Sequence, residues 1–144
     1  MNLEFNIGVH LLTFLVKHSD ERYSSGELAE RICVNPVQLR RVTRKLNEQQ
    51  YLHATRGKFG GYQSNQSTKD VNLADLFVLF NEEKSEGRIF TGNQGSDCEI
   101  SREIGHTMSQ FHQREQDLLV AYYKTITIKD VLKDILKEDS HEKV

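Results

Sequence analysis

The chain has no tryptophan, a single proline at Pro36 and only two cysteines, Cys33 and Cys98, among 144 residues. Two cysteines cannot form a disulfide framework, and no hydrophobic run is long enough to span a membrane. The apolar run 11–16 also lacks the preceding basic region of a secretory signal. We therefore expect a cytoplasmic protein with no membrane partner, in which both cysteines are thiols.

Positive charge is concentrated in one part of an otherwise slightly acidic chain. The sequence has 19 basic and 21 acidic residues, a net charge of −2. Between residues 36 and 62 there is one acidic residue, Glu48, and six basic residues: Arg40, Arg41, Arg44, Lys45, Arg56 and Lys58. A local positive field attracts a polyanion even when the net charge is negative.

Two helices separated by a tight turn are predicted in the first 50 residues after an apolar helix at 3–18. Ser24 or Ser25 can cap a short helix that ends near 33–35. Asn35 and Pro36 then form a strong start for a second helix at 36–49. Its residues Leu39, Val42 and Leu46 recur at helical spacing and face the core, which leaves an outward side that is basic and amide-bearing.

A glycine-tipped hairpin follows, with strands around 51–55 and 62–64 within a predicted wing at 52–64. Arg56 and Lys58 flank Gly57 and can enter or straddle a minor groove. Taken alone, the helix is compatible with a solvated basic face and the hairpin with a plain β-turn. Together they favour a winged helix-turn-helix that binds double-stranded DNA.

The rest of the chain predicts a helical C-terminal half. Asn72 begins a short helix that completes a DNA-binding domain at 1–80, and a polar loop at 81–98 is the predicted sensor segment. A long helix and a terminal helix at 99–137 follow, with fraying from 138 to 144. The terminal helix should pack inward through Ile128, Val131, Leu132, Ile135 and Leu136. A stripe with a single polar member, Glu115, predicts dimerisation through Ile104, Met108, Phe111, Leu118 and Tyr122. The expected fold is mainly α with a small β-hairpin wing.

The segments 25–29, 35–42 and 56–62 resemble the Rrf-two family of bacterial regulators, to which IscR, NsrR and CymR belong. The resemblance extends over essentially the whole chain. It implies a homodimeric transcription factor, usually a repressor, that binds a pseudo-palindromic operator with its third helix in the major groove and its wing in the minor groove. The DNA-binding residues that it implies are Ser25, Asn35, Pro36, Val37, Gln38, Arg40, Arg41, Arg44, Arg56, Lys58 and Tyr62.

The resemblance does not extend to a cofactor. Several relatives hold an iron–sulfur cluster with three cysteines in the loop and the start of the long helix, but region 81–112 of this chain contains only Cys98. His106 and His112 are poorly spaced to join that cysteine at a metal. No cofactor and no metal site are therefore expected. The same three residues lack the motif of a nucleophilic enzyme, so we do not predict an enzyme.

Thiol oxidation is the sharper hypothesis for a signal. Cys98 lies where the loop meets a helix N-terminus, which raises thiol reactivity, and Cys33 lies just before the recognition helix. Oxidation across a dimer can link the sensor segment to the DNA-binding head. The alternatives are two inert thiols, a regulator that responds to a small ligand or metal, and a dimeric adaptor that no longer binds DNA.

Overall fold

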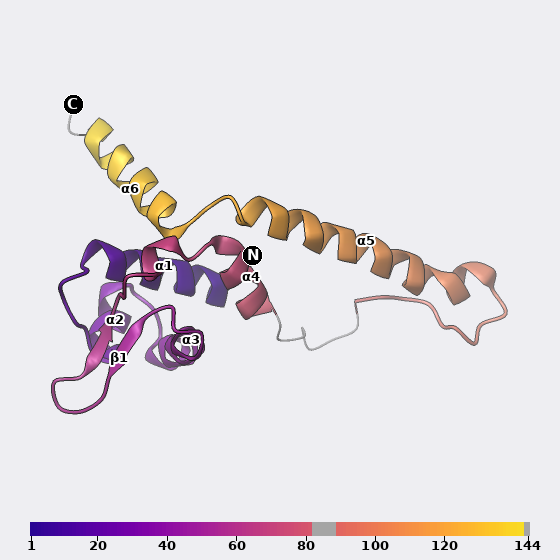
Figure 1. Ribbon diagram of the computed structural model, residues 1–144. Coiled ribbons are helices and arrows are strands. Elements are labelled where there is room, and N and C mark those ends of the chain that lie inside the picture. Colours follow the sequence, from indigo (N-terminus) through magenta and orange to yellow (C-terminus); the bar gives the residue numbers. More distant parts are fainter. Residues whose placement is uncertain (82–88, 143–144) are drawn as a thin grey trace.

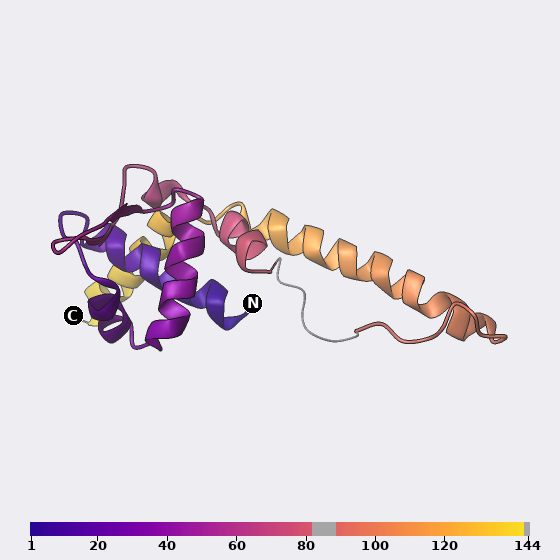
Figure 2. The same cartoon turned by 90° about the horizontal axis from the view of Figure 1, so that it is seen from below.

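One long helix projects from a head built of short helices and a hairpin in the computed structural model (Figures 1 and 2). The structure describes residues 1–81 and 89–142, with side chains up to residue 137. The elements in these residues are α1 (Leu3–Lys17), α2 (Ser25–Arg31), α3 (Pro36–Glu48), β1 (His53–Thr55), β2 (Gly61–Gln63), the 3-10 helix η1 (Thr68–Asp70), α4 (Leu73–Asn81), α5 (Glu99–Tyr123) and α6 (Ile128–Glu142). The predicted mainly α fold with a β-hairpin wing is confirmed.

The helix starts of the N-terminal half follow their predicted caps. The Ser24 hydroxyl accepts from the Glu27 amide at 3.2 Å, and the Glu27 carboxylate accepts from the Ser24 amide at 3.3 Å, which completes a capping box before α2. The Asn35 side chain accepts from the Val37 amide at 2.8 Å, and Pro36 is the first residue of α3. Helix α2 ends at Arg31, slightly earlier than predicted.

Helix α1 lies at the centre of the head and is buried on several sides, as its sequence predicts. Leu11, Leu12 and Leu15 are fully buried. Helices α3, α4 and α6 all pack against α1, and α2 packs against α3. Such a helix holds its neighbours in fixed orientations because close-packed interiors tolerate little displacement.

An aromatic cluster joins α5 to the head. The ring centroids of Phe5 and Phe77 both lie 5.4 Å from that of Tyr123, the last residue of α5. The connection between α5 and α6 also pairs with the residues before α4, because the Leu73 amide donates to the Ile126 carbonyl at 2.8 Å and the Ile128 amide donates to the Val71 carbonyl at 2.9 Å. The base of the long helix is therefore held in place.

Helix α6 differs from its prediction in two respects. It continues to Glu142, beyond the predicted end at residue 137, and residues 143–144 lie outside the described chain. Ile128 is buried and Leu132 half-buried, but Ile135 and Leu136 are 47% and 43% exposed rather than packed inward. Figure 1 shows the reason, since the second half of α6 leaves the head.

No helix within the described residues is long and apolar enough to cross a membrane.

Candidate nucleic-acid interface

The outward side of α3 carries basic side chains around one apolar residue. Arg40 and Arg44 are exposed, and Val37, in the first turn, is 58% exposed. These three residues and Arg41 line a shallow hollow of about 320 Å³. The inward side is fully buried through Leu39, Val42 and Leu46, as predicted from their spacing. Core packing therefore turns the basic side of α3 toward solvent.

Two of the predicted basic residues on α3, Arg41 and Lys45, form ion pairs with an acidic side chain of α1. The Arg41 guanidinium lies 3.3 Å from the Glu4 carboxylate, and the Lys45 ammonium lies 3.9 Å from it. Lys45 also sits over the Phe80 ring, 5.8 Å from its centroid. The two ion pairs join α3 to α1. Arg41 is therefore the least available of the three arginines on this helix for contact with a partner.

The wing is a two-stranded hairpin in which His53 pairs with Gln63 and Thr55 with Gly61. Its turn depends on glycines. Gly57 has a φ of +104°, which favours glycine, and a Cβ on Gly60 would lie 2.1 Å from the Thr55 carbonyl oxygen. The glycines singled out in the sequence thus have a steric reason.

The connection between α1 and α2 supports the wing from the side, a contact that the sequence does not indicate. Tyr23 and Tyr62 exchange backbone hydrogen bonds of 3.0 and 2.7 Å. The Arg22 guanidinium donates to the Phe59 carbonyl at 3.1 Å. The Tyr23 hydroxyl donates to the Glu21 carboxylate, and this bond, together with burial, raises the pKa of Tyr23.

Three parts of the chain meet in a hollow of about 370 Å³ between the start of α2, the end of α3 and the wing. Four residues named from the sequence line it: Ser25, Arg44, Arg56 and Tyr62. Asn47 also lines it and was missed, although it lies one turn after Arg44 on the same side of α3. Tertiary structure therefore unites predicted residues that are up to 37 positions apart.

The remaining residues named on α3 have structural or partly buried positions. The side-chain oxygen of Asn35 caps the N-terminus of α3, and Pro36 is the first residue of that helix. Gln38 is half-buried. At the tip of the wing, Arg56 and Lys58 are both exposed. Val37, Arg40, Arg44, Arg56 and Lys58 form the exposed set that we call the basic face.

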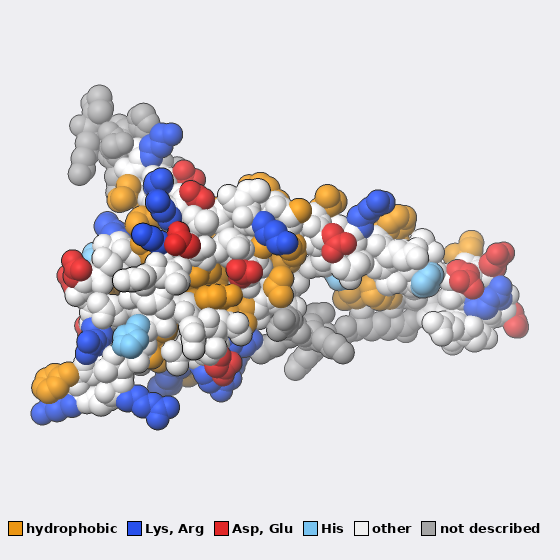
Figure 3. Space-filling view, in the orientation of Figure 1, with side chains coloured by type: hydrophobic (Ala, Val, Ile, Leu, Met, Phe, Trp, Pro, Cys, Tyr) orange, Lys and Arg blue, Asp and Glu red, His pale blue; other side chains and the backbone are white. Residues whose placement is uncertain are grey.

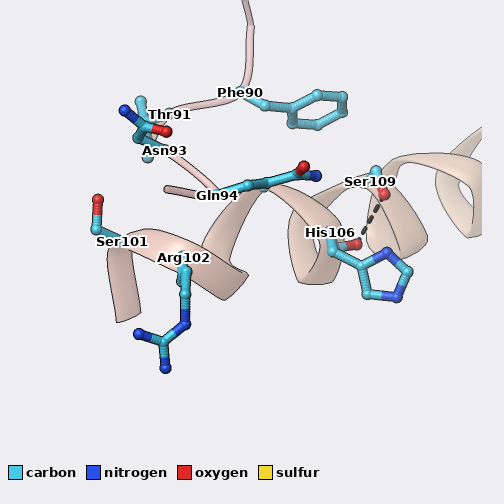
Figure 4. A pocket seen from close by; sticks show the side chains of 10 residues that line it. Phe90, Thr91, Asn93, Gln94, Ser101, Arg102, His106 and Ser109 are labelled. Atoms are coloured by element: carbon cyan, nitrogen blue, oxygen red, sulfur yellow. Dashed lines mark hydrogen bonds between the residues drawn. The ribbon is translucent and has the colours of Figure 1, made fainter. Parts of the chain in front are cut away.

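The far end of α5 carries a third hollow, of about 400 Å³, formed where residues 89–98, the tip segment, return along the helix (Figure 4). The Asn93 amide donates to the Ser101 carbonyl at 2.8 Å, and the Phe90 ring contacts the His112 ring at a centroid distance of 6.0 Å. A Cβ on Gly92 would lie 2.2 Å from the same Ser101 oxygen. The described part of the predicted sensor segment is thus packed on α5, and residues 82–88 lie outside the described chain.

The two cysteines are free thiols at opposite ends of the protomer. Cys33 is exposed in the turn before α3, where its φ is +60°. Cys98 is exposed at the N-cap of α5. Figure 1 shows the start of α5 at the end of the arm farthest from the head. A helix of 25 residues spans roughly 37 Å at 1.5 Å per residue, so these thiols cannot pair within one protomer.

A row of hydrophobic side chains on α5 is left open to solvent. Met108, Phe111, Leu118 and Tyr122 are between 45% and 68% exposed, whereas Ile104 is half-buried beside the tip segment. Figure 3 shows hydrophobic side chains recurring along the arm. Exposed apolar rows of this length are typical of protein–protein contacts.

Comparison with known proteins identifies the family. The sequence profile of the Rrf2 family, described as "Iron-dependent Transcriptional regulator", matches residues 1–134. The chain belongs to the Rrf2 family, the Rrf-two family of the sequence analysis. This is a family of transcriptional regulators and not of enzymes.

Relatives of this Rrf2 protein include solved structures. A candidate transcriptional regulator from Lactobacillus plantarum is 31% identical, with a TM-score of 0.83 over 99% of both chains. CymR, the global cysteine regulator of B. subtilis, is 17% identical with a TM-score of 0.61 over 92% of this chain and 95% of that one, which shows the fold alone. YffB of Lactococcus lactis, a candidate helix-turn-helix regulator, is 32% identical over 83 residues, 57% of this chain and 51% of its own length. The chain spans about half the length of the curated relatives that it matches.

The residues of this Rrf2 chain do not fit the iron in the family description. The whole sequence has two cysteines, and they lie at opposite ends of the protomer. In the part of the chain that the structure describes, no three His, Cys, Asp or Glu side chains are grouped to hold a metal. The Arg102 guanidinium also lies beside the tip, where it donates to the Ser96 and Asp97 carbonyls at 3.2 and 3.3 Å. It places a positive charge beside the tip segment.

Gly60→Ala should loosen the wing. The added Cβ meets the Thr55 carbonyl, and a clash of this kind costs about 1–3 kcal/mol, which corresponds to roughly five- to hundredfold more frequent opening of the hairpin. Limited trypsin digestion measures it as faster cleavage after Arg56 and Lys58. Gly26→Ala is the matched control, since its Cβ would lie 4.0 Å from the nearest atom, the Ser24 hydroxyl oxygen. Equal cleavage of both variants would refute the steric account of the wing.

Proposed function

We propose that this protein is a homodimeric transcription regulator that binds double-stranded DNA in the cytoplasm and represses transcription from a pseudo-palindromic operator. The observation that carries the proposal is the basic face, in which α3 and the wing present exposed cations around a shared hollow. The burial of Leu39, Val42 and Leu46 leaves α3 only this side for a partner. A DNA duplex can meet both elements at once, because its phosphates and its two grooves lie side by side.

The parts of the basic face have different roles in this proposal. Helix α3 enters the major groove, where Arg40 and Arg44 can donate to guanine edges or phosphates and Val37 can contact a thymine methyl. The wing lies over the adjacent minor groove, where Arg56 and Lys58 meet the negative potential of a narrow A·T tract. The start of α2 adds backbone and hydroxyl donors near a phosphate at Ser25.

Arg56→Ala should weaken duplex binding and reduce the slope of log K against log salt by about one, because one phosphate-neutralising cation is lost. Fluorescence anisotropy over a salt series, on fragments selected from genomic DNA, measures both effects. Lys129→Ala removes an exposed charge at the start of α6 and should change neither. If the unmodified protein shows no salt-dependent binding at all, it is the dimeric adaptor and not a DNA-binding regulator.

The dimer in this proposal forms along α5. Its row of Met108, Phe111, Leu118 and Tyr122 is apolar and exposed in one protomer, and Glu115 is the one polar member of the stripe. A second copy related by a two-fold axis buries the same row on both chains, since two-fold interfaces are self-complementary. Two heads held by one stalk then present two copies of α3 to successive major grooves, which accounts for a pseudo-palindromic operator.

Phe111→Asp should convert the dimer to a monomer, because it places an unpaired charge in the centre of the apolar row. Sedimentation equilibrium gives the mass directly. Gln113→Asp adds the same charge on another side of α5 and should leave the dimer intact. A monomeric unmodified protein, or a dimeric Phe111→Asp variant, would show that α5 is not the interface.

Oxidation of the two thiols is the proposed signal. Both are exposed, and their separation within one protomer leaves an intersubunit pair as the only direct link between the α5 tip and the turn before α3. A solved relative of 18% identity, CymR of Staphylococcus aureus, has been described in an oxidised form. A link to Cys33 would act on the recognition helix, because that residue is three positions from its start.

Oxidised protein should migrate as a covalent dimer on a non-reducing gel, and both Cys33→Ser and Cys98→Ser should abolish that species. A dimer that persists in one single variant would instead indicate a bond between two copies of the same cysteine. If no covalent dimer forms, the intersubunit pair is excluded, and the alternatives are a small-molecule signal or two inert thiols.

A further inference from the structure

The most exposed side chain among the large hydrophobic residues of the described chain lies at the tip of the wing. Phe59 is 82% exposed, on the turn between β1 and β2. A phenylalanine ring in water forfeits about 1.5–3 kcal/mol of burial free energy. Phe59 is not part of the packed core of the head, so a polar residue at this position of the turn would leave that core unchanged. Burial of the ring against a partner would recover that free energy.

The turn that carries Phe59 is held in shape. The Gly60 amide donates to the Gly57 carbonyl at 3.0 Å, and the Arg22 guanidinium donates to the Phe59 carbonyl itself at 3.1 Å. The second bond fixes the backbone of the aromatic residue from outside the hairpin. The close approach of Gly60 to Thr55 leaves the turn little freedom. The ring is thus presented on a braced loop, which lowers the ordering cost of inserting it into a partner.

The surroundings of the ring are cationic. The Lys58 ammonium lies 5.8 Å from the Phe59 ring centroid, and Arg56 is exposed on the same turn. Figure 3 shows hydrophobic and basic surface together at the tip of the wing. An apolar protein surface would have to desolvate these charges, whereas a nucleic acid offers phosphates to the cations and base faces to the ring.

We propose that Phe59 is a wedge that enters a base step in the minor groove and bends the operator. The inference rests on the DNA binding proposed above and adds a specific role for a residue outside the basic face. Phenylalanine is among the side chains that minor-groove proteins insert between base pairs, where they unstack a step and kink the duplex. Pyrimidine–purine steps unstack most easily, so the wedge also selects sequence without reading a base edge.

The test compares duplex bending and affinity in three variants on the selected genomic fragment. Bending is measured by energy transfer between dyes at the duplex ends, and unstacking by fluorescence of 2-aminopurine placed along the region under the wing. Phe59→Ser should lose most of the bend and about ten- to hundredfold in affinity, the range of one base–aromatic stack. Its salt slope should not change, because no cation is removed. Phe59→Leu should keep part of the bend, since aliphatic side chains also act as wedges.

Lys58→Ala is the matched control on the same turn. It should lower the salt slope by about one and retain the bend. Thermal unfolding should be equal in all variants, because each site is exposed. Unaltered bending and affinity in Phe59→Ser would overturn the wedge while leaving DNA binding in place, and would assign the ring to a protein partner. Absence of salt-dependent binding by the unmodified protein would overturn both proposals together.

Discussion

The orientation of α3 depends on one contact, the packing of its apolar side against α1. Leu39, Val42 and Leu46 on α3 and Leu11 and Leu12 on α1 are fully buried, and the two helices pack against each other. Because these residues leave no space for α3 to rotate, the opposite side of the helix must face solvent. The Glu4 contacts with Arg41 and Lys45 act on the same pair of helices at the rim of this packing. The direction of the basic face is thus a consequence of the core.

The second part of the interface depends on a contact that joins the wing to the α1–α2 connection. The exchange of hydrogen bonds between Tyr23 and Tyr62 places β2 beside the start of α2, which carries the capping box of Ser24. The wing and the start of α2 are therefore joined directly, and both line one hollow with the end of α3. A ligand that grips all three elements meets a preformed surface, which reduces the entropic cost of binding.

Helix α5 separates the head, which carries the basic face, from the tip segment, which carries Cys98. The aromatic cluster of Phe5, Phe77 and Tyr123 anchors the base of α5, while the tip segment packs on the start of α5. The family description includes iron, but the described residues of this chain contain no group of three His, Cys, Asp or Glu side chains that could hold a metal.

Most of the local structure was predictable from the sequence because short-range rules govern it. The caps at Ser24 and Asn35, the apolar spacing on α3 and the glycines of the wing each act within a few residues. Predictions that depended on distant partners were less secure. Ile135 and Leu136 have the spacing of a buried pair yet are exposed, because α6 leaves the head before it reaches them.

The sequence by itself determined the family, the element order and the charge of the α3 and wing segments. Only the tertiary structure decided which charges are available and which residues meet. Arg41 is drawn to Glu4 across 37 positions, Asn47 joins the hollow at the wing, and Arg22 braces the carbonyl of Phe59. The physical reason is that spacing along a chain encodes the faces of its helices and strands, whereas contacts between elements depend on how those faces pack around a shared core.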